Sequence, residues 1–169
     1  MNKMKKSTND SPSTLAVYSD YPRAAYFISH IYDANLNELH GESIPLSEWN
    51  AMLEQDDSDE INLLILDPKI PCAWLKINGL DHPDTAWISM LAVLPSMKRK
   101  GIGTFAIEYA EKYLADLGKK TIRIRTTQDN LPALALYRKC GYQIVDDGSY
   151  VTADGVKRQG FVLSKNIVS

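Results

Sequence analysis

The spacing of apolar residues along the chain alternates between the period of a strand and the period of a helix. Thr14–Tyr18 predicts a short first strand. After Asp20, which can cap a helix, apolar residues recur at helical spacing from position 25 to position 39, and Gly41 ends that stretch. A second, short helix is predicted to begin at Ser47.

Three apolar runs with strand character follow, and residues typical of turns separate them. The runs are Ile61–Leu66, Cys72–Ile77 and Ala86–Leu94. Asp67-Pro68 follows the first run and Asn78-Gly79 follows the second, and both pairs are turn signals. This part of the chain therefore predicts an antiparallel meander.

Beyond Pro95 the pattern alternates between helix and strand. The expected elements are a helix with an apolar face from Ile102 to Leu117, a strand at Thr121–Thr126, a helix through Ala133 to Tyr137, and strands at Tyr142–Val145 and Gly160–Leu163. The order is strand, helices, three strands, helix, strand, helix and two strands. It predicts a mixed α/β (α+β) sheet and not a regular βα repeat.

Composition favours a soluble protein with one domain. Of the 169 residues, 44% are apolar and 24% are charged, which is the balance of a globular chain. The Ser-, Asn- and Lys-rich segment 1–13 is predicted to be a disordered tail, and 14–169 a single domain. No apolar run approaches the ~20 residues that a membrane span needs, and the basic start lacks the apolar core of a secretory signal.

The numbers of cysteines and histidines bear on the expected cellular location and on whether a metal site is expected. The chain has two cysteines, Cys72 and Cys140, and three histidines, without a Cys/His cluster. A disulfide framework is therefore not expected, and a reducing cytoplasm is the expected location. No metal site is predicted, because no zinc-type spacing is present.

The net charge of −2 hides an asymmetry along the chain. Residues 1–97 carry a net charge of −8, residues 98–139 carry +6, and residues 140–169 carry 0. The total argues against a uniformly basic nucleic-acid binder, whereas the middle segment is the place to expect an anionic ligand. The acidic first half is a weak indication of a cationic acceptor such as an amine.

The basic middle segment begins with a glycine-containing stretch, Lys98-Arg99-Lys100-Gly101-Ile102-Gly103. It lies between a strand that closes at Pro95 and an amphipathic helix. The free N–H groups and the dipole of a helix start favour an anion, and glycines let the backbone approach a phosphate. The alternative is a basic loop whose glycines serve only the turn.

The segment Gly101–Ala106 also fits the dinucleotide fingerprint G-x-G-x-x-A. Its context differs, because six residues, Pro95 to Lys100, separate the strand from the first glycine. The following strand reads Ile122-Arg123-Ile124-Arg125, where an acidic residue should stand. The context therefore disfavours a dinucleotide site.

A second informative stretch runs from Thr126 to Tyr142. Asn130 stands where a strand gives way to a helix, and Tyr137 lies two turns further on the same face. Taken alone, Asn130 is typical of a helix cap and Tyr137 of a core aromatic residue.

Taken together, the two stretches resemble the GNAT superfamily, the GCN5-related N-acetyltransferases. The family signature [Gln/Arg]-x-x-Gly-x-[Gly/Ala] aligns with Lys98 to Gly103, and its Asn…Ala…Tyr…Gly-[Phe/Tyr] block aligns with Asn130, Ala133, Tyr137 and Gly141-Tyr142. These motifs cover about residues 87–142. The resemblance implies a central, mixed, mostly antiparallel sheet of six to seven strands, flanked by about four helices and splayed between the fourth and fifth strands.

The resemblance also implies a function. The protein is expected to move an acetyl group from acetyl-CoA to an amine of a small molecule or a protein, by direct attack in a ternary complex and without a metal. A backbone N–H of Val93 or Leu91 would polarise the thioester, and Tyr137 would be the catalytic acid. The implied cofactor-binding residues are Leu91, Ala92, Val93, Lys98, Arg99, Lys100, Gly101, Ile102, Gly103, Thr104, Asn130, Ala133 and Tyr137.

Two positions depart from the family pattern. Lys98 replaces the usual Gln or Arg and offers a phosphate no bidentate contact. Arg125 stands where some members carry a glutamate base. The candidate bases that remain are Glu38, His40, Glu42 and Asp84, each of which is also typical of a surface residue. A water chain or an amine that arrives neutral are the alternatives.

The acceptor should meet the first-helix region, the strand ends and the loop from Asp146 to Arg158. Tyr32, Trp49 and Tyr150 either line a pocket there or pack the core. A non-catalytic acyl-CoA sensor of the same fold is the rival function. Family members are often dimers, so the resemblance also admits a homodimer.

Overall fold

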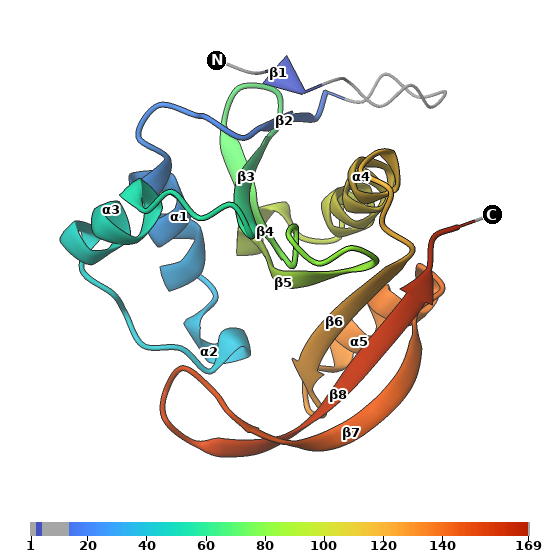
Figure 1. Ribbon diagram of the computed structural model, residues 1–169. Coiled ribbons are helices and arrows are strands. Elements are labelled where there is room, and N and C mark those ends of the chain that lie inside the picture. Colours follow the sequence, from blue (N-terminus) through green and yellow to red (C-terminus); the bar gives the residue numbers. More distant parts are fainter. Residues whose placement is uncertain (1–2, 5–13, 169) are drawn as a thin grey trace.

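The computed structural model describes residues 3–4 and 14–168, whose strands form one mixed sheet in the order β1-β2-β3-β4-β5-β6-β8-β7 (Figure 1). The strands are β1 Lys3–Met4, β2 Ala16–Tyr18, β3 Glu60–Leu66, β4 Pro71–Asn78, β5 Thr85–Val93, β6 Thr121–Thr127, β7 Gln143–Val151 and β8 Lys157–Asn166. The helices are α1 Ala24–Asp33, α2 Leu36–Leu39, α3 Leu46–Glu54, α4 Ile102–Asp116 and α5 Leu131–Lys139, with a 3₁₀ turn at Pro95–Met97.

Helices cover the sheet on both faces. One core cluster joins the apolar faces of α4 and α5 to residues such as Ile88 and Ile124 of the central strands. The other cluster joins α1 and α3 to Trp74 and Ala92. On α4 the buried residues lie on one face, which is the stripe that its amphipathic sequence predicts; they are Ile102, Ala106, Ile107, Ala110 and Leu114.

The pairing between β5 and β6 is the feature that positions the site. It is the one parallel pair among the described strands, and it runs only from Thr85 opposite Thr121 to Ile88 opposite Ile124. Beyond that point β5 continues to Val93 and β6 to Thr127 without pairing with each other. The predicted splay between the fourth and fifth expected strands is confirmed, and these strands are β5 and β6.

The predicted strands and helices are all present, and the differences lie at element ends. The helical stretch predicted from Asp20 begins later, after Arg23 in a left-handed conformation (φ 61°), and it breaks after Asp33. Asn35 explains the break, because its amide donates to Ile31 O at 2.9 Å and to Val93 O at 3.0 Å. The chain therefore turns to start α2 on the end of β5.

The C-terminal hairpin is longer than its apolar residues indicated. β7 runs to Val151 and is exposed along almost its whole length, so its pattern carries little apolar signal. Of the predicted tail, only Lys3–Met4 is described, and it pairs with β2 as β1. The remainder of the segment 1–13 lies outside the described residues. No described helix has the length and apolar character that crossing a membrane requires.

Candidate functional site

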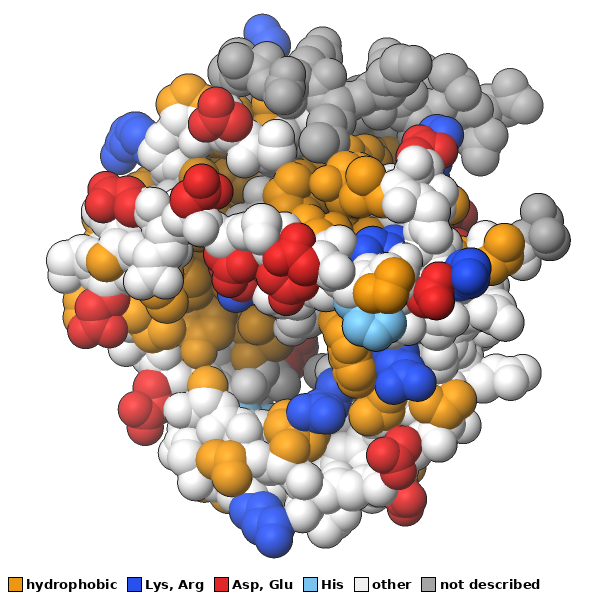
Figure 2. Space-filling view, in the orientation of Figure 1, with side chains coloured by type: hydrophobic (Ala, Val, Ile, Leu, Met, Phe, Trp, Pro, Cys, Tyr) orange, Lys and Arg blue, Asp and Glu red, His pale blue; other side chains and the backbone are white. Residues whose placement is uncertain are grey.

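A cavity of about 1010 Å³ lies where β5 and β6 separate. The splayed ends of the two strands line it, together with the first turn of α4, one face of α5, the α2 region and the end of β7. Figure 2 shows the molecule hollowed between its N-terminal half and the β6–β8 strands, with basic side chains gathered beside the hollow over β6 and β8. All of the predicted cofactor-binding residues line this cavity except Lys100.

The N-terminus of α4 faces this cavity. Arg99 and Gly101 both adopt left-handed conformations (φ 63° and 80°), which turn the chain sharply into the helix. The first backbone bond of the helix is made by Phe105, whose N–H donates to Gly101 O at 3.0 Å. The N–H groups before it have no intrahelical acceptor. The arrangement gives the predicted anion site its donors and a favourable dipole.

The two glycines of the motif are required for different structural reasons. Gly101 needs its positive φ, and a Cβ there would meet no atom within 4 Å. Gly103 needs its small size, because a Cβ would lie 2.8 Å from Leu136 Cδ2 on α5. Gly101 therefore makes the turn into the helix possible, while Gly103 lets α5 pack against the first turn of α4.

The three successive cations of the motif point to different places. Lys98 Nζ donates to Glu38 Oε2 of α2 at 2.6 Å. Arg99 lines the cavity. Lys100 does not line it and places its Nζ 3.8 Å from Met97 Sδ. The sequence motif thus overstates the positive charge at the cavity by one side chain.

The end of β5 turns toward the cavity backbone groups that β6 does not pair. Leu94 N–H donates to Cys72 O at 2.8 Å on the β4 side. Because successive residues of a strand direct their N–H and C=O groups to opposite sides, those of Val93 and Leu91 point into the opening. The contact from Asn35 to Val93 O agrees with this direction.

Asn130 and Tyr137 each have a structural position and also line the cavity. Asn130 caps α5, with its Oδ1 accepting from Ala133 N at 3.3 Å, and it also lines the cavity. Tyr137 also lines the cavity and is only 7% exposed. Burial raises the pKa of Tyr137 to about 12, and the neighbouring Tyr150 and Cys140 act in the same direction.

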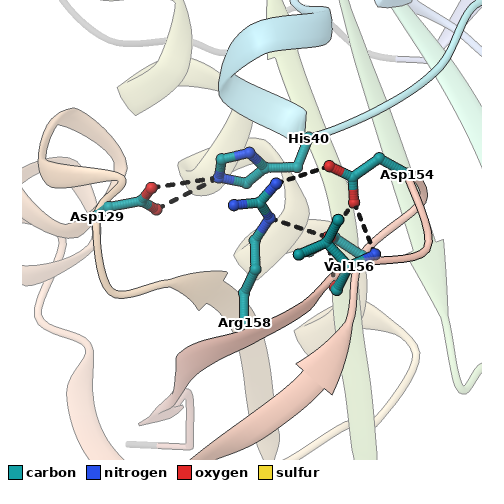
Figure 3. A network of polar contacts seen from close by, with 6 residues as sticks. His40, Asp129, Asp154, Val156 and Arg158 are labelled. Atoms are coloured by element: carbon teal, nitrogen blue, oxygen red, sulfur yellow. Dashed lines mark hydrogen bonds and ion pairs between the residues drawn. The ribbon is translucent and has the colours of Figure 1, made fainter.

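A polar network closes the cavity on the α2 side (Figure 3). His40 Nε2 lies 3.4 Å from both carboxylate oxygens of Asp129, which follows β6. The backbone of His40 is held too, because its carbonyl accepts from Asp154 N at 2.9 Å. Asp154 in turn binds Arg158 at 2.7 Å, and Arg158 Nε donates to Thr152 Oγ1 at 3.1 Å.

The four candidate bases differ in whether they line the cavity. Glu38 and His40 line the cavity, whereas Glu42 and Asp84 do not. Asp84 pairs with Lys120 at 2.9 Å. Glu38 is engaged by Lys98, so His40 is the candidate base whose position best suits the role.

The three aromatic residues that were predicted either to line a pocket or to pack the core also differ in position. Tyr32 and Trp49 are buried, with ring centroids 5.3 Å apart, and they pack the core of α1 and α3. Tyr150 lines the cavity. Trp87 and the side chain of Arg125 were not predicted as lining residues, although both face the opening. The alternation of Arg123 and Arg125 with buried isoleucines on β6 was the sequence signal that could have indicated Arg125.

The cavity can accommodate an extended ligand with an anionic end. It combines a helix N-terminus, an unpaired strand edge and a buried tyrosine hydroxyl, with a histidine–carboxylate pair on the other side. In the described part of the chain, no group of three or more His, Cys, Asp or Glu side chains is placed to hold a metal ion.

Comparison with known proteins gives the family. The model of the acetyltransferase (GNAT) family matches residues 16–142. Streptothricin acetyltransferase of Escherichia coli is 32% identical over 143 residues, which are 79% of this chain and 80% of that protein. A mycothiol acetyltransferase of Pseudarthrobacter chlorophenolicus is 32% identical over 71 residues, 41% of this chain, and the match spans only 22% of that relative's length.

A solved structure agrees with the fold. The spermidine N-acetyltransferase of Vibrio cholerae, in complex with CoA and spermine, superposes with a TM-score of 0.80 at 17% identity, covering 91% of this chain and 96% of that one. The family match covers both motifs and most of the described residues. The chain therefore belongs to the GNAT family of acetyltransferases.

Proposed function

We propose that the protein transfers an acetyl group from acetyl-CoA to an amine of a small molecule or a protein, by direct attack in a ternary complex. The observation that carries the proposal is the single cavity that joins the N-terminus of α4 to the unpaired edge of β5. An anionic cofactor with a long, hydrogen-bonding arm fits these two features together. Family membership supplies the reaction class.

In this proposal the pyrophosphate of acetyl-CoA binds at the start of α4. Backbone N–H groups from Gly101 to Thr104 would hold it, with Arg99 beside them. Lys98 is available only when it leaves Glu38, so this ion pair competes with the cofactor. Lys100 lies off the cavity, so this proposal gives it no contact with the cofactor.

The arm of the cofactor would then follow β5 into the opening. The N–H groups of Val93 and Leu91 point there, and one of them would donate to the thioester carbonyl. As the amine attacks, negative charge grows on that oxygen, and a fixed donor stabilises the charge more than it stabilises the neutral carbonyl. The sulfur then leaves as a thiolate.

Tyr137 would stabilise the leaving thiolate. Its pKa of about 12 keeps the hydroxyl protonated at neutral pH. An ordinary thiol has a pKa of about 8.5, so the proton would stay mostly on the tyrosine. Tyr137 therefore acts chiefly as a hydrogen-bond donor to sulfur.

His40 would accept the proton that the attacking amine loses. Its Nε2 faces Asp129, and a carboxylate that contacts one ring nitrogen fixes the orientation of the imidazole. The contact with Thr127 and then that with His40 hold the pKa of Asp129 below its usual value, so Asp129 is charged at neutral pH. Of the candidate bases, only His40 combines a place on the cavity with such a partner.

The test is turnover with a defined amine panel. Purified protein is incubated with acetyl-CoA and each amine, thiol release is measured, and the acetylated amine is identified by mass spectrometry. Lineweaver–Burk lines that intersect support a ternary complex, whereas parallel lines would contradict it. CoA binding without turnover of any amine would favour the sensor of the same fold.

The cytoplasm is the proposed location. Both cysteines are free thiols in the structure, which suits a reducing compartment. Acceptor and cofactor are the proposed partners, and no nucleic acid is among them.

A further inference from the structure

Arg125 occupies the point where the sheet opens. It follows Ile124, the last residue of β6 that pairs with β5. Ile124 is 1% exposed and lies in the core with α4, so its neighbour Arg125 is directed to the opposite face of the sheet. The side chain lines the cavity there. Arg125 therefore faces the part of the cavity that lies away from the start of α4.

Two aromatic rings hold the guanidinium of Arg125 in place. Its Cζ lies over the ring of Trp87 of β5 at 5.7 Å and over the ring of Tyr150 of β7 at 5.2 Å, measured to the centroids. Stacking of this kind leaves the in-plane N–H donors of a guanidinium free. The two rings come from different sides of the opening, so Arg125 is fixed in orientation while its donors stay available.

The charge of Arg125 has no carboxylate partner. No carboxylate of the described residues forms an ion pair with it. Among the described residues, Glu38 is the one acidic residue that lines the cavity, and it binds Lys98. Asp129 lies just behind the lining, where it faces His40. Four basic side chains line the same cavity: Lys98, Arg99, Arg125 and Lys139. The phosphates of the cofactor can neutralise those near α4, but Arg125 lies on the other face.

The acidic first half of the chain does not change this balance. Its densest part includes Asp56, Asp57 and Glu60, which line a separate cavity of about 260 Å³ beside α1 and α3. The whole-chain charge pattern had indicated a cationic acceptor. The charges that surround the cavity indicate the opposite sign.

We propose that Arg125, clamped by Trp87 and Tyr150, docks the carboxylate of an amine acceptor, and that the acceptors are therefore amino acids or similar amino-carboxylates. This proposal rests on the proposed function, because it names the second substrate of the same cavity. A carboxylate matches two parallel N–H donors of a guanidinium, which fixes both position and orientation. The amine of the acceptor is then left to reach the thioester.

Equilibrium binding tests the proposal without turnover. Isothermal titration of the CoA-loaded protein is run with the standard α-amino acids and with their carboxamides, which differ only at the carboxylate. For the amino acids that bind, wild type should favour the acid by about 10- to 100-fold, as for hydrogen bonds to charged groups. Arg125→Gln should abolish the preference, and Arg125→Lys should restore part of it.

Arg123→Gln is the matched control. Arg123 lies on the same strand and face, with its Cζ 5.9 Å from the Trp87 ring centroid, but it does not line the cavity. This variant should keep the preference. Unchanged melting temperatures and unchanged Kd for CoA in both variants would exclude a general loss of structure.

A turnover arm separates this proposal from the proposed function. With an accepted amino acid, Arg125→Gln should raise KM about tenfold or more and leave kcat within about twofold, since Arg125 orients the acceptor and not the reacting bond. Binding of carboxamides or spermidine as tightly as the amino acids, or an Arg125→Gln variant that loses CoA instead, overturns the carboxylate site. A carboxylate preference in binding without any thiol release overturns only the acetyl transfer.

Discussion

His40 and Asp129 face each other across the opening between β5 and β6, with His40 Nε2 3.4 Å from both carboxylate oxygens (Figure 3). The first residue caps α2 and the second follows β6, so they belong to the two halves that the splay separates. The backbone of His40 is fixed in addition by Asp154 of the β7–β8 hairpin. The proposed base would therefore have a defined position beside the amine substrate.

His40→Gln should lower kcat/KM by at least about tenfold at neutral pH, because a positioned base contributes about 10²–10⁴-fold. Steady-state kinetics at neutral pH measure the change. Glu42→Gln, off the cavity, is the control. A His40→Gln enzyme with the wild-type rate would exclude His40 as the base.

Tyr137→Phe should lower kcat by about 10²-fold through loss of the donor to the thiolate. Tyr142→Phe is matched to it, because Tyr142 is also buried, lies 6.5 Å from Tyr137 between ring centroids and does not line the cavity. Its kcat should be unchanged. Since the pKa of Tyr137 is about 12, its loss of a proton should not limit the rate below about pH 10. Equal effects of the two variants would remove Tyr137 from the mechanism.

Gly103→Ala and Gly101→Ala should destabilise the protein for different reasons. At Gly103 the new Cβ meets Leu136, and overpacking costs about 1–3 kcal/mol. At Gly101 the cost is the left-handed backbone, about 1–2 kcal/mol. Leu136→Val, which removes the colliding atom, should therefore rescue Gly103→Ala and not Gly101→Ala. Urea unfolding measures the cycle, and equal rescue of both variants would contradict the assignment.

Glu38→Gln should tighten CoA binding by a few-fold, because it releases Lys98 from its ion pair. The gain should shrink as salt is raised from about 0.01 M to about 1 M, since screening weakens an exposed charge. Isothermal titration at several salt concentrations measures it. Weaker CoA binding by Glu38→Gln would show that the ion pair shapes the loop instead of competing with the cofactor.

Acid should weaken the hairpin through Asp154. Hydrogen bonds from Thr152 and then from Arg158 lower the pKa of Asp154 to about 2, below the ordinary value of about 3.9. The stability that this carboxylate contributes is therefore full above about pH 4 and is lost as the pH falls towards 2. Asp154→Asn should flatten the melting-temperature curve over that window. An unchanged curve would show that the ion pair adds no stability.

Local patterns predicted much of this site because they act over short distances. The helix start at Gly101, the cap at Asn130 and the two-turn spacing to Tyr137 are each visible within a few residues. The splay followed from the family resemblance carried by those motifs, and the register of β5 and β6 confirms it.

The remainder of the site depends on contacts between distant segments. Lys98 meets Glu38, and His40 meets Asp129, across 60 and 89 positions of the chain. Composition could not show that the acidic segment lies at another cavity, nor that Lys100 turns away from its neighbours. In the sequence, Arg125 marks only the absence of a glutamate at that position, because its partners Trp87 and Tyr150 come from two other strands.

The most direct test of acetyl transfer is thiol release from acetyl-CoA with simultaneous mass spectrometry of the amine, comparing wild type with Tyr137→Phe and Tyr142→Phe. We predict one acetylated amine for each CoA released, a rate reduced only by Tyr137→Phe, and intersecting initial-velocity lines. Tight CoA binding with no acetylated product from any amine of the panel would contradict the proposed function.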